Sequence, residues 1–235
     1  VEPEEAAMPG AMPGATPTAD RPTIPDDRLR LVFTCCHPAL APEAQVALTL
    51  RLVCGVATPD IARAFLVAEP TMAARLTRAK KKIAAARIPY AVPPAEALPA
   101  RLDAVLSVVH LLYATGHTAP TGGDLVRDDI TARAVDLARL LVALLPAAPE
   151  AAGLLALLLA DEARRATRTD EHGRLVRLED QDRRRWDRDL IAEADRLIVR
   201  ALGAAPPGRF TVQAAIAALH AEAPSYATTD WPQIV

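Results

Sequence analysis

The sequence is poor in aromatic residues, in cysteines and in long apolar runs. Aromatic side chains make up 3% of its 235 residues, and it has three cysteines. Three thiols cannot form a paired disulfide framework, which favours a reducing compartment over secretion. The most apolar stretch, residues 151–160, is about half of the roughly 20 residues that a membrane-spanning helix needs. We therefore expect a cytoplasmic protein that does not span a membrane.

An excess of either charge is also missing. The chain has 27 Lys and Arg against 29 Asp and Glu, a formal net charge of −2. The total charge therefore gives no sign of nucleic-acid binding, and any basic surface must be local. The first residues are acidic and no basic segment precedes an apolar run, so we expect no signal peptide. Apolar residues make up 51% of the chain, which predicts that most of it folds around a core.

Prolines divide the chain into segments. Residues 1–25 are rich in Pro, Ala, Gly and Met and predict a flexible linker. Residues 26–90 predict several short helices, because apolar residues recur at helical spacing between prolines. Residues 91–100 are a second proline-rich linker, and 101–235 form a helical extension. Its predicted helices cover about 98–116, 127–145, 150–168, 190–203 and 211–222.

Strand patterns are almost absent. One short extended candidate lies at Leu175, Val176 and Leu178, and no alternating run of useful length occurs. The predicted fold class is therefore all-α.

Residues 58–83 predict a helix-turn-helix. Thr58 and Pro59 suit the N-cap and first turn of a short helix. A turn at residues 67–70 follows, and a second helix is expected to begin at Pro70 or Thr71. Two short helices crossing over a tight turn are typical of this DNA-binding motif. The residues predicted to face inward are Ile61, Ala62, Phe65, Met72, Leu76, Ala79 and Ile83.

The second of these helices carries a local excess of positive charge. No acidic residue occurs from Pro70 to Tyr90. Cations that neutralise phosphates release counterions, so this helix can bind nucleic acid despite the net charge. A merely solvated helix face, the plain alternative, usually interleaves Glu with its Lys and Arg. We expect the first turn to approach base edges and the later cations to follow the phosphate backbone. The predicted DNA-binding residues are Glu69, Thr71, Arg75, Arg78, Lys80, Lys81 and Lys82.

The stretch LRLVCG at 50–55, followed by TPDIARAFLVAEPTMAARLTRAKKKI at 58–83, resembles the C-terminal promoter-binding domain of extracytoplasmic-function (ECF) RNA polymerase sigma factors. The resemblance covers roughly residues 28–88. It implies that this part binds the −35 element of promoter DNA and the β-subunit flap of core RNA polymerase. Leu66 stands where the family usually has a turn glycine, and we expect the turn to close nonetheless.

The flanking segments extend the resemblance. The stretches RLRLVFTCCHPAL at 28–40, VVHLLYATGH at 108–117, GRLVRLEDQDRRRWD at 173–187 and TDWPQIV at 229–235 are similar to a subgroup of ECF sigma factors with a C-terminal extension of TPR-like helical repeats. The chain then corresponds to the −35-binding domain and part of the extension. The family's −10-binding domain is absent from it. The scarcity of aromatic residues agrees with that absence, because capture of unstacked bases usually needs aromatic platforms.

Two other groups of residues could carry chemistry. Cys35, Cys36 and Cys54 are spaced wrongly for a zinc knuckle and are better explained as small buried side chains, so we expect no metal and no cofactor. The charged segment 179–189 has paired carboxylates without a nucleophile or phosphate loop, which favours ion-pairing and helix-capping roles over catalysis. Within it, Trp186 could be an exposed docking residue for an anti-sigma or other regulatory partner, or could anchor the helix that follows.

Three functions remain open from the sequence. The first is a sigma factor, or a fragment of one, in which catalysis belongs to the polymerase and not to this chain. The second is a stand-alone helix-turn-helix regulator that uses the extension as a sensor or oligomerisation domain. The third is a helical scaffold, for which the basic helix would be a coincidence.

Overall fold

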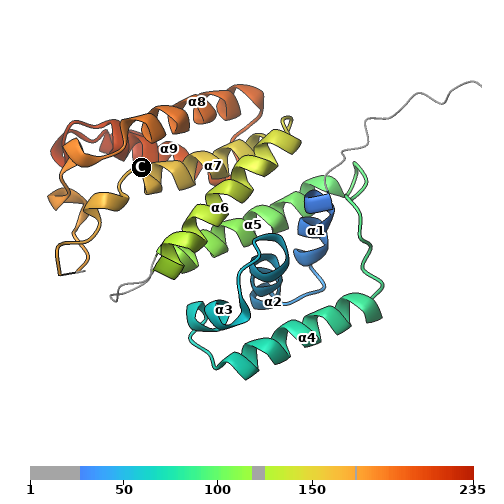
Figure 1. Ribbon diagram of the computed structural model, residues 1–235. Helices are drawn as coiled ribbons and strands as arrows, with labels where there is room; N and C mark the ends of the chain where they lie inside the picture. Colours follow the sequence, from blue (N-terminus) through green and yellow to red (C-terminus); the bar gives the residue numbers. More distant parts are fainter. Residues whose placement is uncertain (1–26, 118–124, 173) are drawn as a thin grey trace, which may run out of the picture.

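The protein is all-helical in the parts that the structure describes. Figure 1 shows the computed structural model, in which residues 27–117, 125–172 and 174–235 are described. The predicted linker at 1–25 lies outside these residues. The α-helices are α1 (Asp27–Cys35), α2 (Pro42–Leu48), α3 (Thr58–Ala64), α4 (Glu69–Ala85), α5 (Leu98–His117), α6 (Leu125–Leu144), α7 (Pro149–Glu162), α8 (Arg188–Ala204), α9 (Arg209–Glu222) and α10 (Trp231–Ile234).

The short extended candidate at Leu175, Val176 and Leu178 is present only in part. Leu175 makes a single antiparallel bridge with Thr169, and Leu178 begins the 3-10 turn η3 (Leu178–Asp180). Next to the bridge, Asp170 accepts hydrogen bonds from the backbone N–H groups of His172 and Arg174, each at 2.9 Å. The prediction of an all-α fold is confirmed.

The N-terminal helices pack around a core of large apolar side chains. Leu29 and Phe33 of α1, Leu48 of α2 and Leu50 are fully buried. α2 continues directly into η1, a π-helical turn at Thr49–Val53. Gly55, with φ +72°, follows two residues after its end. α4 packs on α2 and α3 and lies at the edge of the molecule away from α5–α9 (Figure 1).

The C-terminal helices surround α7. Residues 151–160 of α7 are all buried, because α5, α6, α8 and α9 contact it from several sides. The predicted burial of this helix is therefore confirmed, although it ends at Glu162 and not near residue 168. The returning loop explains the early end, since the backbone N–H of Asp187 donates to the carbonyl of Ala163 at 3.0 Å.

α7 and α9 approach closely at their N-terminal ends. The carboxylate of Glu150 on α7 accepts hydrogen bonds from the backbone N–H groups of Phe210 (2.9 Å) and Thr211 (3.1 Å). It thereby satisfies donors that the first turn of α9 leaves without an intrahelical partner. Gly153 lies directly against Thr211, so that α7 has no side chain at the point of contact.

α5 joins the two parts of the chain that the sequence separates. It begins at Leu98, inside the predicted linker at 91–100, and packs on α1 and α2. The Arg101 guanidinium donates to the carbonyl of Phe33 at 2.6 Å, and Arg133 of α6 donates to the carbonyl of Cys54. One continuous apolar cluster runs from Leu29 through α5–α7 to α9. The division into a helix-turn-helix domain at 26–90 and an extension at 101–235 stays a prediction.

In the described part of the chain, none of the helices combines the length and the apolar character that crossing a membrane requires.

Candidate nucleic-acid interface

The helix-turn-helix is built from α3 and α4. Each has a proline in its first turn, Pro59 and Pro70, where a missing N–H costs no helical hydrogen bond. α4 begins at Glu69, slightly before the predicted start, because Ala68 takes the extended conformation of an N-cap. Thr58 is likewise the first residue of α3 and not its N-cap, which is Ala57. Neither N-cap makes a side-chain hydrogen bond, so neither helix begins with one of the usual capping side chains.

The turn between the helices closes at Leu66. This residue has φ +53°, the left-handed conformation that glycine adopts most easily. The N–H of Leu66 bonds the carbonyl of Arg63 at 3.1 Å, and the N–H of Val67 bonds that of Ala62 at 3.0 Å. This is the Schellman pattern that commonly ends helices. The prediction that the turn closes with leucine in place of glycine is confirmed, and the leucine side chain is 85% exposed.

The inward faces of the two helices match the prediction. Ile61 and Ala62 of α3 pack with Met72, Leu76 and Ala79 of α4, and all five are buried. The other two residues expected to face inward are half-buried; they are Phe65 and Ile83.

The predicted DNA-binding residues occupy three sides of α4. One side carries Thr71, Arg75 and Lys82, which recur at helical spacing. Arg78 and Lys81 lie nearer the side opposite the core. Glu69 and Lys80 lie on the other flank of the helix, across from Thr71 and Lys82. All seven are exposed except Arg75, which is half-buried.

Arg75 has a partner that the sequence did not predict. Its guanidinium lies 5.6 Å from the centroid of the Phe65 ring, a cation–π distance. Phe65 is the C-cap of α3, so the contact crosses the turn. The pattern predicted only that Phe65 faces inward; its spacing from Arg75 across a turn gives no signal of a contact.

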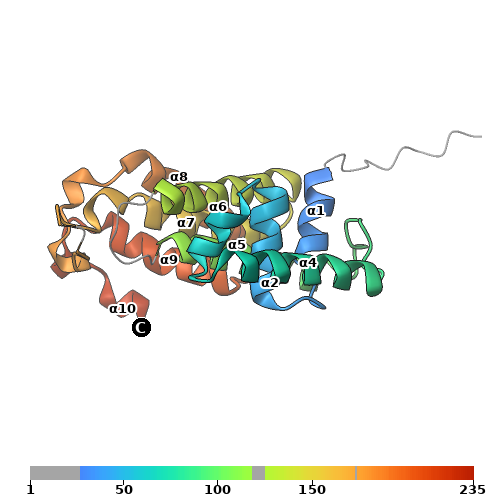
Figure 2. The same ribbon diagram turned by 60° about the horizontal axis from the view of Figure 1, so that its bottom comes forward.

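The cations farther along α4 have no acidic partner. Within the described ranges, no ion pair involves Arg78, Lys80, Lys81 or Lys82. The nearest element in the sequence, α3, keeps its own charges paired, because Arg63 bonds Asp60. Figure 2, in which the bottom of Figure 1 comes forward, shows α4 in front of α2. Cations without an acidic partner on an exposed helix favour the binding of a polyanion.

Two of the three cysteines are buried thiols. Cys35 and Cys36 are buried, and Cys36 lies 3.6 Å from the hydroxyl of Thr49. Burial raises the pKa of both thiols to about 12, so neither forms a thiolate near neutral pH. Among the residues that the structure describes, no three His, Cys, Asp or Glu side chains gather closely enough to hold a metal ion.

Trp186 is not an exposed docking residue, so that hypothesis is wrong. Its ring is 3% exposed, its Nε1 donates to the hydroxyl of Thr167 at 2.9 Å, and Arg183 stacks on it at 4.6 Å. The charged segment around it has the capping roles that the sequence predicted. Asp187 accepts hydrogen bonds from the first backbone N–H groups of α8, and Arg184 pairs with Asp182.

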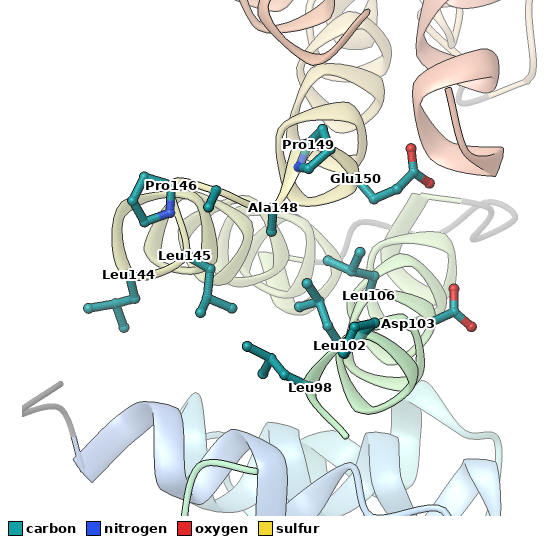
Figure 3. Close-up of a pocket in the computed structure, with 12 residues that line it drawn as sticks. Leu98, Leu102, Asp103, Leu106, Leu144, Leu145, Pro146, Ala148, Pro149 and Glu150 are labelled. Atoms are coloured by element: carbon teal, nitrogen blue, oxygen red, sulfur yellow. The ribbon is translucent and has the colours of Figure 1, made fainter. Parts of the chain in front are cut away.

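The extension contains an apolar groove of about 510 Å³. Figure 3 shows leucines of α5 and of the end of α6 lining it beside the first turn of α7. Its two acidic residues are engaged elsewhere: Asp103 pairs with Arg209 at 3.0 Å, and Glu150 caps α9. The groove therefore offers apolar contact and no group for acid–base chemistry.

The N-terminal and C-terminal parts of the chain match different protein families. Residues 30–83 match the family Sigma-70, region 4, and residues 101–202 match a family of unknown function (DUF6596). A curated relative is 47% identical over 209 residues, which cover 89% of this chain and 49% of the relative. It is an uncharacterized protein of Rhizobium meliloti (strain 1021), and the chain spans about half of its length. No solved structure matches the chain significantly.

The region 4 match covers α3, the turn and nearly all of α4, and in sigma factors this region has a −35 DNA-binding role. The chain thus has a sigma-70 region 4 helix-turn-helix domain in its N-terminal part, and further helices follow it.

Proposed function

We propose that the protein is an ECF-type sigma factor whose region 4 domain binds −35 promoter DNA and core RNA polymerase during transcription initiation. The observation that carries the proposal is the group of exposed cations on α4, Arg78, Lys80, Lys81 and Lys82, within the segment that matches sigma-70 region 4. The chemistry of transcription then belongs to the polymerase, and this chain is a cytoplasmic binding protein without a cofactor.

The arrangement of α4 supports a division of roles among its polar residues. Its first turn begins with Glu69 and Thr71, which are exposed where a recognition helix approaches base edges. Lys82 and Lys80 lie on opposite flanks of the helix. A helix inserted in the major groove has a phosphate backbone on either side, so these two lysines suit contacts to different strands. Arg75, Arg78 and Lys81 complete the proposed interface.

The family resemblance also implies a contact with core RNA polymerase. We propose that the helix-turn-helix domain binds the flap of the β subunit. The helical extension, which resembles TPR-like repeats, is proposed to support the domain or to bind a regulatory partner such as an anti-sigma factor. Trp186 has no part in that proposal because it is buried.

The proposal predicts steep salt dependence of binding to a −35 duplex. We expect the slope of log K against log salt to decrease in magnitude by about 0.9 for each phosphate that the protein no longer neutralises. Arg78→Ala combined with Lys82→Ala should therefore flatten the slope by about 1.8 and weaken binding at low salt. Fluorescence anisotropy across a salt series measures both quantities.

The matched control is Arg196→Ala combined with Arg200→Ala. Both residues are exposed on α8 and the charge change is the same, so the slope should keep its wild-type value. A slope that does not respond to the α4 substitutions, or that responds equally to both pairs, contradicts the proposal.

The stand-alone regulator is the second candidate, and one observation favours it. The apolar groove between α5, α6 and α7 would suit a sensor domain. Copurification separates the candidates: a sigma factor is retained on core RNA polymerase in the absence of DNA, and a stand-alone regulator is not.

A further inference from the structure

The side of α4 opposite its buried row has an uneven composition. Ala74, Thr77, Arg78 and Lys81 share this outward face, because their spacing of three and four residues repeats with the helix. All four are exposed. The half toward the C-terminus is cationic, whereas the half toward the N-terminus presents small side chains. If α4 is a recognition helix, its N-terminal half is the part that faces base edges.

Thr77 has its hydroxyl engaged within the helix. Its Oγ1 donates to the carbonyl of Ala73 at 2.9 Å, which uses the only proton that the hydroxyl has. The side chain therefore has no hydrogen to donate to the acceptor atoms that guanine and thymine present in the major groove. The hydroxyl oxygen can still accept a hydrogen bond, and the γ-methyl group is the apolar part of Thr77 that is left for an intermolecular contact.

Thymine is the base that offers a matching group. Its C5 methyl projects into the major groove, and alanine and threonine methyl groups are among the apolar contacts that recognise it. The unpaired cations Arg78 and Lys81 follow on the same face and would hold the duplex next to Thr77 through its phosphates.

We infer that Thr77 is a specificity-determining residue that packs its γ-methyl against the C5 methyl of a thymine in the bound duplex. This inference rests on the proposed function, since it needs α4 to enter the major groove. The target of Thr77 is then a T·A base pair, and the neighbouring cations contact the phosphate backbone of the DNA.

The experiment compares thymine with deoxyuridine, which lacks only the C5 methyl. The probe is a duplex selected from a random pool by the full chain at low salt, and each thymine in it is replaced singly by deoxyuridine. At the contacted position we expect wild-type affinity to fall about fourfold, the value of one buried methyl group. Thr77→Ser, which keeps the hydroxyl and removes the methyl, should bring the thymine-to-deoxyuridine affinity ratio at that position close to one.

Two further variants make the result specific. Thr77→Val keeps a methyl at that place and removes the hydroxyl, so it should retain the ratio. Lys82→Ala should weaken binding to both duplexes equally and also retain it. A ratio of one at every position in the wild type, or a ratio that survives Thr77→Ser, overturns the inference while leaving duplex binding intact. Failure to select any duplex at low salt overturns the proposed function instead.

Discussion

At the scale of single residues, Leu66 is held in a conformation that its side chain disfavours. A left-handed backbone costs an L-residue other than glycine about 1–2 kcal/mol, and Leu66 contributes little burial in return because it is 85% exposed. We expect Leu66→Gly to raise the free energy of unfolding by about 1 kcal/mol, which a urea titration followed by circular dichroism measures.

The matched control places glycine where the backbone is helical. Ala74 is exposed within α4, so Ala74→Gly should lower the free energy of unfolding by about 1 kcal/mol. A destabilising effect of Leu66→Gly would contradict the account of the turn.

The sequence located individual residues well where helical spacing decides their environment. Met72, Leu76 and Ala79 are buried as predicted, because each follows from the period of one helix. The burial of Trp186 and the contact of Arg75 with Phe65 do not follow from such spacing. The surroundings of Trp186 and Arg75 depend on Thr167 and Phe65, which reach them across turns and loops that no short pattern specifies.

At the scale of elements, prolines mark several helix starts, and the end of α7 is the boundary in the extension that the sequence missed by most. Pro42, Pro59, Pro70 and Pro149 all lie in the first turn of a helix, which is a local signal. The end of α7 is set by a hydrogen bond from the distant Asp187 to Ala163. Information of that kind is tertiary, so the periodicity of α7 overestimated its length.

The contact of α7 with α9 depends on the absence of a side chain at Gly153. A Cβ at this position would lie 2.7 Å from the backbone nitrogen of Thr211 and 2.8 Å from its Cα, closer than packed atoms allow. We expect Gly153→Ala to lower the free energy of unfolding by about 1–3 kcal/mol, because α9 must shift away from α7. The measurement is the urea midpoint.

Gly203 provides the comparison within α8. A Cβ there meets nothing within 4 Å, so Gly203→Ala should leave stability unchanged or raise it by up to about 1 kcal/mol. Equal effects of the two substitutions would show that helix propensity and not the close approach decides the outcome.

At the scale of the whole molecule, the helix-turn-helix and the extension share a core through α5. We therefore expect one cooperative unfolding transition. Both tryptophans, Trp186 and Trp231, lie in the extension, so their fluorescence should lose its native signal at the same urea concentration at which the amides of α4 lose protection from hydrogen exchange. A clear gap between the two midpoints would instead support the independent domains that the sequence suggested.

Arg101→Ala tests the junction directly. Removing the guanidinium leaves the carbonyl of Phe33 without this donor, and we expect the free energy of unfolding to fall by about 2 kcal/mol. The urea midpoints of the tryptophan signal and of the α4 amides should then fall together. A change confined to the tryptophan signal would contradict the shared core.

If α4 enters the major groove as proposed, the packing of α5 on α1 and α2 also fixes where the extension lies around the duplex. With α4 in the major groove, the direction in which α5–α9 project is set by packed helices and not by a hinge. The extension can then meet only those proteins that occupy the same side of the DNA helix. Moving the −35 element by half a helical turn, roughly 5 base pairs, would carry the extension to the opposite side. The spacing of a promoter would thus determine which partners the extension can reach.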